Sequence, residues 1–380
     1  SSIPKHVRLF RTTVTNSATE TAVLSKLKRG TGGRASFNGL VATVFGANGF
    51  LGRNVISHLA RTGTQIIVPY RGDSYYVKDL KVLGELGQIM FMPFHLEDEE
   101  TLRKAMRYSD VVINLIGSQT STRNFSLHQV NTDGAARIAR ISKELDVQRL
   151  IHVSALSQNP SPDSFVRGPS KFMKSKADGE SEVRRERRDA IIFRPADMWG
   201  ENDRFLSYYA AKPRRFGWSR VVNIPLWKLG TQTIKQPVYV GDVARGIVES
   251  ITHPDAPGSI YEAVGPHRYR LDDLVKWIYF VCRYLPSEVF ICNINIAFTS
   301  RIVVNEFFSH MHPALSFERL EREFVNDVLS GTLTLNDLSV RPVKLEDRIH
   351  HLLFLYRRMN YYWDCVGEFP EPPNPPLQLA

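Results

Sequence analysis

The sequence predicts an α/β fold, with a parallel sheet whose two faces are both covered by helices. Short apolar runs alternate with helical stretches along the chain, and near-continuous apolar strands are typical of sheets that are buried on both faces. The first apolar run, residues 41–45, leads directly into the glycine-rich segment GANGFLG at 46–52. Leu51, Val55 and Leu59 then recur at the spacing of one helix face.

The elements of this fold can be followed in chain order. Most of the apolar runs are separated by polar, helical stretches, so we expect the strands to run parallel and to be joined by helical crossovers. We expect strands at 41–45, 65–69, 88–94, 110–116, 149–154 and 190–194, and helices that begin near 51 and cover 99–108, 127–142 and 171–188.

The glycine-rich segment is the most specific motif, and its spacing is G-x-x-G-x-x-G. Gly46 permits the tight turn off the strand, Gly49 lets the backbone approach phosphates, and Gly52 lets the helix pack closely on the sheet. A pyrophosphate would lie at the helix N-terminus, where free N–H groups and the helix dipole favour negative charge. The motif predicts a Rossmann-type, doubly wound domain that binds a dinucleotide; the alternative is that the glycines serve packing alone. The expected contacts are Gly46, Asn48, Gly49, Phe50, Leu51 and Gly52.

The end of the second predicted strand indicates which dinucleotide is bound. An NAD-selective site places an acid there, on the ribose 2′-hydroxyl. This chain instead has Arg71, whose guanidinium could pair bidentately with the 2′-phosphate of NADP(H). Asp73 comes slightly too late and is expected in the following loop. We therefore favour NADPH over NAD(H); the alternative is that Arg71 is simply solvated.

Composition and charge bear on the other classes of function. The net charge of +10 is compatible with contact to nucleic acid, anionic lipid or an acidic protein, and it does not choose among them. No aromatic stacking platform accompanies the basic run at 184–188, so nucleic-acid binding is not expected. The three cysteines form no CxxC pair and the eleven histidines show no metal-ligand spacing, so neither a disulfide framework nor a metal site is expected.

The chain divides into four expected parts. Residues 1–38 hold seven Lys or Arg and a single acid, which resembles a mitochondrial targeting sequence or its flank; a flexible basic arm is the alternative. The nucleotide-binding domain is expected at 39–270, with some elements of the C-terminal subdomain inserted after about residue 195. A smaller, mostly helical subdomain is expected at 271–365, and 366–380 is a proline-rich, extended tail.

The smaller subdomain is expected to make contacts beyond its own fold. Apolar residues form helical stripes in 271–285 and 343–363, and 289–308 carries few charges. A helical subdomain that completes the fold explains the first stripe, whereas docking on partner proteins or at a membrane surface explains the regions beyond 286. The best candidate for a membrane span, 274–298, is broken by charges and a proline, so no transmembrane helix is expected.

Segments from about 40 to 270 carry a family resemblance. They are VATVFGANGFLGRNV at 41–55, VINLIG at 112–117, LIHVSAL at 150–156, FRPADMWGENDRFL at 193–206, KQPVYVGDVARGIV at 235–248 and YEAVGPHRY at 261–269, together with Asn131 in VNTDG. This combination resembles the extended and atypical short-chain dehydrogenases/reductases. It is closer still to one branch of them, the nucleotide-binding accessory subunits of mitochondrial respiratory complex I.

In active members of that family, a Tyr-x-x-x-Lys pair and a serine carry out proton transfer. Ser154 and Lys176 match the serine and the lysine, but Phe172 occupies the tyrosine position. A phenyl ring cannot donate or accept a proton, and general acid–base catalysis contributes roughly 10²–10⁴ in rate. The resemblance therefore implies a degenerate site without a catalytic residue. It also implies that Leu115, Ile116, Gly117, Ser154, Lys176 and Pro195 lie against the cofactor. His95 stands where many relatives have an acid near the adenine, and it either contacts the adenine or is only a loop residue.

The function that the resemblance implies is that of a non-catalytic accessory subunit of complex I that binds NADPH tightly for structural stability or assembly. Its expected partners are other complex I subunits, and its expected location is the matrix side of the mitochondrial inner membrane, with peripheral contact to the membrane surface. Two alternatives stay open. One is an active NADP-dependent reductase or epimerase acting on a small carbonyl compound, and the other is a nucleotide-regulated nucleic-acid-binding protein, which rests on charge alone.

Overall fold

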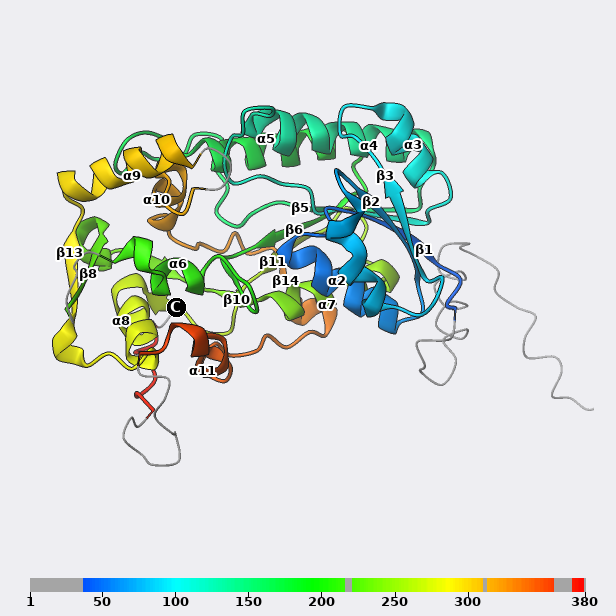
Figure 1. Cartoon of the computed structure of the whole chain (residues 1–380). Coiled ribbons are helices and arrows are strands. Elements are labelled where there is room, and N and C mark those ends of the chain that lie inside the picture. The colour runs from blue at the N-terminus through cyan, green and yellow to red at the C-terminus, as the bar shows by residue number, and fades with distance from the viewer. Residues whose placement is uncertain (1–36, 216–220, 310–312, 359–370, 379–380) are drawn as a thin grey trace, which may run out of the picture.

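The computed structural model describes residues 37–215, 221–309, 313–358 and 371–378 (Figure 1). Within these residues, eight parallel strands form the central sheet, in the order β3-β2-β1-β4-β5-β6-β11-β14. The first six positions have the strand order of the doubly wound Rossmann fold, so the predicted fold class is confirmed. The strands are β1 (Val41–Phe45), β2 (Gln65–Tyr70), β3 (Ile89–Pro93), β4 (Val111–Asn114), β5 (Arg149–Val153), β6 (Ile191–Pro195), β11 (Ile260–Ala263) and β14 (Leu333–Thr334).

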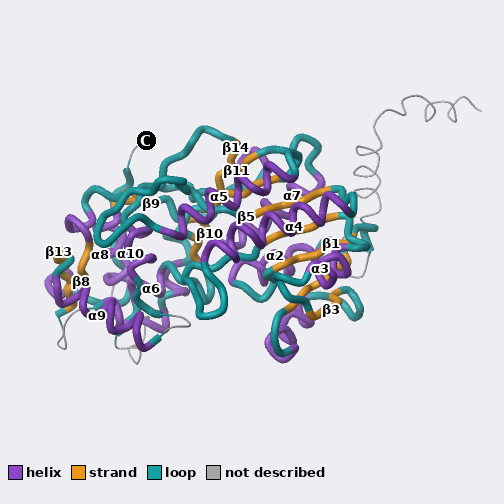
Figure 2. Tube along the Cα trace, turned by 90° about the horizontal axis from the view of Figure 1, so that it is seen from above, coloured by secondary structure: helices purple, strands orange, loops and turns teal. Residues whose placement is uncertain are grey.

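Helices cover both faces of this sheet, as Figures 1 and 2 show. Successive strand residues point to opposite faces, and each face has its own core. Val44 packs in the core that α2 and α7 cover, whereas Phe45, the next residue, packs in the core that α3 and α4 cover. The bounds are α2 (Phe50–Arg61) and α7 (Val240–Thr252) on the first face, and α3 (Glu99–Met106), α4 (Gly134–Glu144) and α5 (Lys171–Glu186) on the second, with the turns η2 (Ser74–Leu83) and η3 (Gln129–Asp133).

A second body, mostly helical, packs against the end of the sheet and has its own apolar core. Its centre is α8, whose Leu274 and Ile278 are completely buried. The predicted helical subdomain is thereby confirmed. Its elements are α6 (Leu206–Ala210), η4 (Lys212–Arg214), β8 (Val222–Leu226), η5 (Trp227–Gly230), α8 (Leu271–Val281), η6 (Pro286–Glu288), β13 (Val289–Asn293), α9 (Ile296–Phe308), α10 (Phe317–Glu323), α11 (Ile349–Leu352) and η8 (Phe354–Tyr356).

The chain passes between the two bodies several times. Short strand pairs join them: β7 (Met198–Trp199) with β10 (Val238–Tyr239), and β9 (Ile234–Lys235) with β12 (Tyr269–Arg270). The outermost strand of the central sheet, β14, and the turn η7 (Leu335–Leu338) come from beyond residue 270, where the sequence predicted that the smaller subdomain begins.

One predicted helix is wrong. The apolar stripe in 343–363 suggested a long helix, but its described part contains only the four residues of α11 and the short turn η8. Leu345, Ile349 and Leu353 are nevertheless buried in the core of the second body. A loop that follows the core surface can bury residues at helical spacing without forming a continuous helix. Residues 359–363 of the stripe lie outside the described residues.

Two further expectations concern the chain ends and the membrane. Residues 371–378 of the proline-rich tail form no helix, and Leu377 makes an isolated antiparallel bridge to Tyr269 of β12. The basic segment 1–36 lies outside the described residues. None of the helices in the described part of the chain has both the length and the hydrophobicity needed to span a bilayer.

Candidate nucleotide-binding site

The glycine loop joins β1 to α2 at the switch point of the sheet, between β1 and β4. Gly46 has φ of +77°, and a Cβ there would stand 2.9 Å from the carbonyl carbon of Leu115. A Cβ on Gly52 would stand 2.5 Å from the carbonyl oxygen of Ala47. Side chains do not fit at either position, so the turn can bring β1, β4 and α2 this close only with glycine.

The first turn of α2 has the properties of an anion site. Gly49 is the N-cap residue and supplies no side-chain hydrogen bond, and the first turn contains no acidic residue. The N–H groups of this turn have no partner within the helix, and the helix dipole makes this end positive. A phosphate group at the loop would therefore meet free donors and a favourable field.

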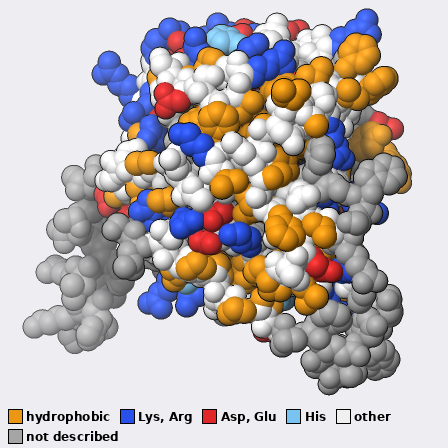
Figure 3. Space-filling model, turned by 90° about the vertical axis from the view of Figure 1, so that its left-hand side faces the viewer, with side chains coloured by type: hydrophobic (Ala, Val, Ile, Leu, Met, Phe, Trp, Pro, Cys, Tyr) orange, Lys and Arg blue, Asp and Glu red, His pale blue; other side chains and the backbone are white. Residues whose placement is uncertain are grey.

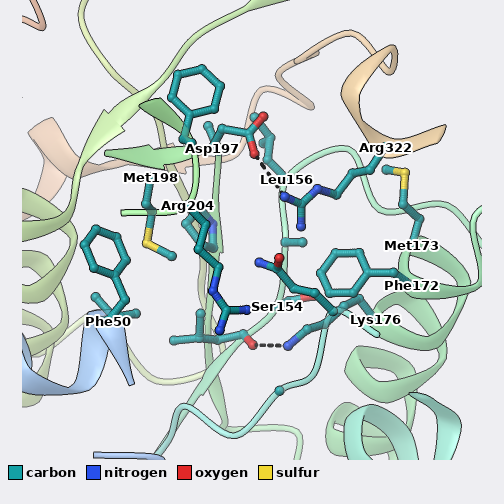
Figure 4. Close-up of a pocket in the computed structure, with 18 of the residues that line it drawn as sticks. Phe50, Ser154, Leu156, Phe172, Met173, Lys176, Asp197, Met198, Arg204 and Arg322 are labelled. Atoms are coloured by element: carbon teal, nitrogen blue, oxygen red, sulfur yellow. Dashed lines mark hydrogen bonds and ion pairs between the residues drawn. The ribbon is translucent and has the colours of Figure 1, made fainter. Parts of the chain in front are cut away.

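A cavity of about 310 Å³ lies in front of this loop, at the carboxyl ends of the central strands (Figure 4). Ligands of open parallel sheets bind in this position. Most of the residues that the sequence predicted for the site line the cavity together. They are Gly46, Gly49, Phe50, Leu51, Gly52, Leu115, Gly117, Ser154, Phe172, Lys176 and Pro195.

Four of the predicted cofactor residues do not line this cavity: Asn48, Arg71, His95 and Ile116. The exposed Asn48 accepts a hydrogen bond from the Arg53 side chain, at 3.1 Å. The backbone N–H of Ile116 donates to the side-chain oxygen of Asn114, at 3.0 Å, and this bond turns the chain at the end of β4.

Arg71 and His95 are both absent from the cavity lining, and both lie near Phe125, a residue that the sequence did not single out. The Arg71 guanidinium is 5.8 Å from the ring centre of Phe125, and the His95 ring is 6.0 Å from the same centre. Asp73 caps η2 instead, because its carboxylate accepts the N–H of Tyr75 at 2.9 Å. A group that extends from the glycine loop past the end of β2 would meet a cation and two rings.

Lys176 projects from α5 into the floor of the cavity. Its Nζ donates to the carbonyl oxygen of Val153, at 3.2 Å, and the side chain is 6% exposed. Burial lowers the pKa of Lys176 to about 8. Gly117 leaves room for this amine, because a Cβ on Gly117 would stand 2.9 Å from Nζ. The lysine therefore holds a desolvated positive charge that an anionic or hydroxyl-bearing ligand would stabilise.

Neither Ser154 nor Phe172, which stands at the tyrosine position of the family's catalytic set, is arranged for proton transfer. The Ser154 hydroxyl donates to Gln158 at 2.8 Å, and Gln158 in turn donates to Glu180. The ring of Phe172 lines the cavity, and the Arg322 guanidinium lies 5.1 Å from its centre. Neither arrangement presents an acidic hydroxyl to the cavity.

The loop that follows β4 is fixed to α5 by Asn131. Its side-chain oxygen accepts the N–H of Ser118 at 2.9 Å, and its side-chain nitrogen donates to the Ser175 hydroxyl at 2.9 Å. Asn131 lies in the π-type turn η3, and such turns are frequent at functional sites. A Cβ on Gly179 would stand 2.3 Å from the carbonyl oxygen of Asn131, so α5 packs against this turn very closely.

The far side of the cavity holds an ionic cluster that the sequence analysis missed. Lys235 Nζ lies 3.3 Å from an Asp197 oxygen and 3.6 Å from an Asp327 oxygen, and Arg322 lies 3.6 Å from the other Asp197 oxygen. Figure 4 shows the contact between Asp197 and Arg322 at the cavity wall. The signal that the sequence offered for Asp197 was an acid close behind the predicted strand 190–194. The other members of the cluster, Lys235, Arg322 and Asp327, lie far away in the sequence, and no sequence pattern pointed to them.

Comparisons with known proteins agree with this geometry. Residues 42–263 match the model of the NAD dependent epimerase/dehydratase family. Among solved structures, dTDP-glucose 4,6-dehydratase from Streptomyces venezuelae, with NAD and TYD bound, has a TM-score of 0.59 at 17% identity and covers 86% of this chain and 100% of that one. UDP-glucose 4-epimerase from Thermotoga maritima has a TM-score of 0.56 at 17% identity, with 83% and 98% covered. These likenesses show the fold.

Sequence relatives are closer. The chain is 41% identical to "NADH dehydrogenase (ubiquinone) 1 alpha subcomplex subunit 9, mitochondrial" of Rattus norvegicus, over 89% of this chain and 85% of that protein. The protein of the same name from Dictyostelium discoideum is 36% identical, with 87% and 89% covered. The mitochondrial NADH-ubiquinone oxidoreductase 40 kDa subunit of Neurospora crassa is 33% identical, with 88% and 84% covered. The chain therefore belongs to the NAD dependent epimerase/dehydratase family and to the family of mitochondrial NADH dehydrogenase (ubiquinone) 1 alpha subcomplex subunit 9.

Proposed function

We propose that this chain is an accessory subunit of mitochondrial respiratory complex I that holds NADPH without turning it over. Its relatives are named as subunits of NADH dehydrogenase or NADH-ubiquinone oxidoreductase, and the match extends over most of both chains. Other complex I subunits are then its partners. Its location is the matrix side of the inner membrane, with peripheral contact to the membrane surface.

The observation that carries the non-catalytic part of the proposal is Phe172. It lies four residues before Lys176 on α5, and both line the nucleotide cavity. Hydride transfer to a carbonyl needs a proton donor, and the phenyl ring has none. The Ser154 hydroxyl, which could position a carbonyl, donates to Gln158 instead. The site keeps the features that bind a dinucleotide and lacks those that transfer the proton.

Two observations support NADPH over NADH. Arg71 follows β2 directly, at the place where a 2′-phosphate would need a cation, and its guanidinium lies 5.8 Å from the ring centre of Phe125. Asp73, the acid that follows it, is already committed to capping η2. A carboxylate at this position would repel the 2′-phosphate, whereas a guanidinium pairs with it.

The bound ligand and the lack of turnover can be tested on one preparation. Mass spectrometry of the small molecules released on denaturation should identify NADPH or NADP in near-stoichiometric amount. Incubation of the native protein with NADPH and a panel of carbonyl compounds should give no turnover of dehydrogenase size. The control is Lys174→Ala, because Lys174 is exposed on the same helix and does not line the cavity. Turnover that is lost in Lys176→Ala and kept in Lys174→Ala would instead establish an active reductase.

Assembly is tested separately. Native fractionation of solubilised mitochondrial membranes should place the chain in a megadalton assembly together with complex I activity. A chain that migrates alone at its own mass would contradict the proposed role as a subunit, whatever nucleotide it carries.

A further inference from the structure

The start of α5 is held by a carboxylate that comes from the second body. Ser170 is the N-cap residue of α5, and its hydroxyl accepts the N–H of Met173 at 3.3 Å and donates to Glu318 of α10 at 2.6 Å. The same oxygen of Glu318, Oε1, accepts the N–H of Phe172, also at 2.6 Å. A carboxylate at a helix N-terminus satisfies free N–H groups and is favoured by the helix dipole. The first turn of α5 therefore depends on α10.

The loop just before α5 is held by a second carboxylate of α10, that of Glu321. Its Oε2 accepts the N–H of Phe165 at 2.7 Å, and its Oε1 accepts those of Val166 and Arg167 at 2.7 and 2.6 Å. Glu321 is only 3% exposed. Buried N–H groups are costly to leave without an acceptor. Removal of this carboxylate would therefore force the loop to move or to remain with unsatisfied donors.

The helix α10 is itself fixed to the core of the second body. Residues three apart lie on the same side of a helix, so Glu318 and Glu321 reach the start of α5 together. Leu320, between them, is completely buried in the core of the second body. Glu323 pairs with the buried Arg214 at 2.8 Å. The two carboxylates are thus mounted on a helix that the second body holds in place.

The start of α10 is fixed in turn by the last turn of α9. The Glu306 side chain accepts the N–H of Phe317 at 2.7 Å, and the Asn305 side chain accepts the N–H of Leu315 at 3.1 Å. A series of hydrogen bonds from side chains to backbone groups therefore joins α9 to α10 and α10 to the start of α5.

The first turns of α5 carry residues of the nucleotide cavity. Phe172, Met173 and Lys176 all line it, as Figure 4 shows. Lys176 lies about one turn beyond Phe172, the residue whose N–H Glu318 accepts. Groups that bind a ligand must be held in place by the contacts around them. A shift at the start of α5 would therefore move the Lys176 amine relative to a bound dinucleotide.

We propose that Glu318 and Glu321, which we call the α10 clamp, are positioning residues of the nucleotide site, and that through them the second body controls how firmly the dinucleotide is held. Neither carboxylate lines the nucleotide cavity, so the clamp acts through α5. The proposal rests on the proposed binding of NADPH and adds the part of the molecule that regulates it.

The test uses the full chain with NADPH bound. Nicotinamide fluorescence after addition of excess NADP measures the rate of NADPH dissociation, at a temperature at which every variant is folded. Glu321→Gln should release NADPH about tenfold faster or more, the value of a hydrogen bond to a charged group, because both carboxylate oxygens accept N–H groups and an amide nitrogen cannot. Glu318→Ala should have a similar effect.

The conservative variant is Glu318→Gln. Both hydrogen bonds of Glu318 go to one oxygen, and the amide oxygen of glutamine can take its place. Glu318→Gln should therefore restore most of the natural dissociation rate that Glu318→Ala loses. The same substitution should thus be tolerated at residue 318 and not at residue 321.

The controls are Leu274→Ala and Ile278→Val, which remove buried atoms from the core of the second body and leave the clamp in place. They lower stability without changing the carboxylates, and their dissociation rates should stay within about twofold of the natural rate. The proposal is overturned if Glu321→Gln releases NADPH at the natural rate, or if a core variant with the same loss in melting temperature releases it equally fast. Absence of the dinucleotide from the natural chain counts against the proposed function, whereas unchanged release in the clamp variants counts against the clamp alone.

Discussion

At the scale of single residues, Lys176 shows how the site is prepared for a ligand. The amine is buried, it donates a hydrogen bond to the neutral carbonyl of Val153, and its pKa is lowered to about 8. A buried charge of this kind destabilises the unliganded fold. Binding of a group that accepts a hydrogen bond from the amine would recover part of that cost, so ligand binding and stability should be linked through this residue.

The lowered pKa of Lys176 gives the first prediction. The unfolded chain has the ordinary pKa of 10.5, so between pH 8 and 10.5 the unfolded state binds more protons than the folded state. The contribution of Lys176 to the free energy of unfolding therefore rises with pH between pH 8 and 10.5. In nucleotide-free protein, Lys176→Met should be more stable than the natural chain below pH 8, by up to about 3 kcal/mol.

Urea unfolding from pH 7 to 10 measures this difference, because the other titrating groups are common to both proteins and cancel. The advantage of Lys176→Met should shrink as the pH rises. A difference that stays constant over this range would show that the buried amine is not the titrating group.

Arg71 gives the second prediction at this scale. Arg71→Gln should weaken NADPH binding by about tenfold to a hundredfold, the value of a hydrogen bond to a charged group, and should leave NADH affinity almost unchanged. Arg61→Gln, on the last turn of α2, is the control, and it should change neither affinity. Equal losses for the two dinucleotides in Arg71→Gln would mean that this residue does not recognise the 2′-phosphate.

At the scale of elements, the glycine loop and α2 form one unit whose glycines have different tasks. Gly52 is required for packing, because a Cβ would stand 2.5 Å from the Ala47 carbonyl oxygen. Gly49 has φ of −73°, which any residue can adopt, and the contact of its Cβ with the Gly46 oxygen would be 3.2 Å. The absence of a side chain at Gly49 therefore serves ligand binding more than it serves packing.

The third prediction separates these two tasks. Gly52→Ala should destabilise the protein by about 1–3 kcal/mol or more, because the backbone must move apart. Gly49→Ala should fold with nearly natural stability but retain much less nucleotide, since its methyl group occupies the surface that the pyrophosphate approaches. Gly168→Ala, with open space around its Cβ, should change neither property. Thermal unfolding measures the stability of each variant, and the nucleotide content of the purified protein measures retention. Full nucleotide retention in Gly49→Ala would contradict the role of Gly49 in binding the pyrophosphate.

At the scale of the whole molecule, the local sequence pattern predicts the strands, helices and glycine loop. Contacts between segments that are far apart in the sequence depend on how the whole chain folds, and the pattern does not predict them. The strand at 41–45 and the glycine loop could be predicted because strand, turn and helix follow one another directly. The expected strand 110–116 ends early, at Asn114, because the Asn114 side chain accepts the N–H of Ile116. The contact of Lys235 with Asp327 could not be predicted, since it depends on the chain returning from the second body to the sheet.

The second body also carries an apolar helix face, and this gives the last prediction. Phe298 and Ile302 of α9 are buried, whereas Val304 is 54% and Phe308 80% exposed. Hydrophobic side chains gather, among Lys and Arg, on the side of the molecule that Figure 3 presents. Because this chain belongs to a family whose members are named as subunits of a larger enzyme, we expect the exposed face of α9 to be covered by a partner subunit.

The double variant Val304→Ser and Phe308→Ser should keep its nucleotide and lose little stability, because exposed substitutions usually change the free energy of unfolding by about 0.5 kcal/mol or less. Its incorporation into complex I, measured by native electrophoresis after expression in cells that lack the chain, should fall sharply. The control is Val82→Ser with Leu86→Ser, which has the same spacing and comparable or greater exposure but lies beside β3, at the other end of the molecule. If both double variants assemble equally well, α9 does not form the docking surface, and the contact with complex I must use another part of the molecule.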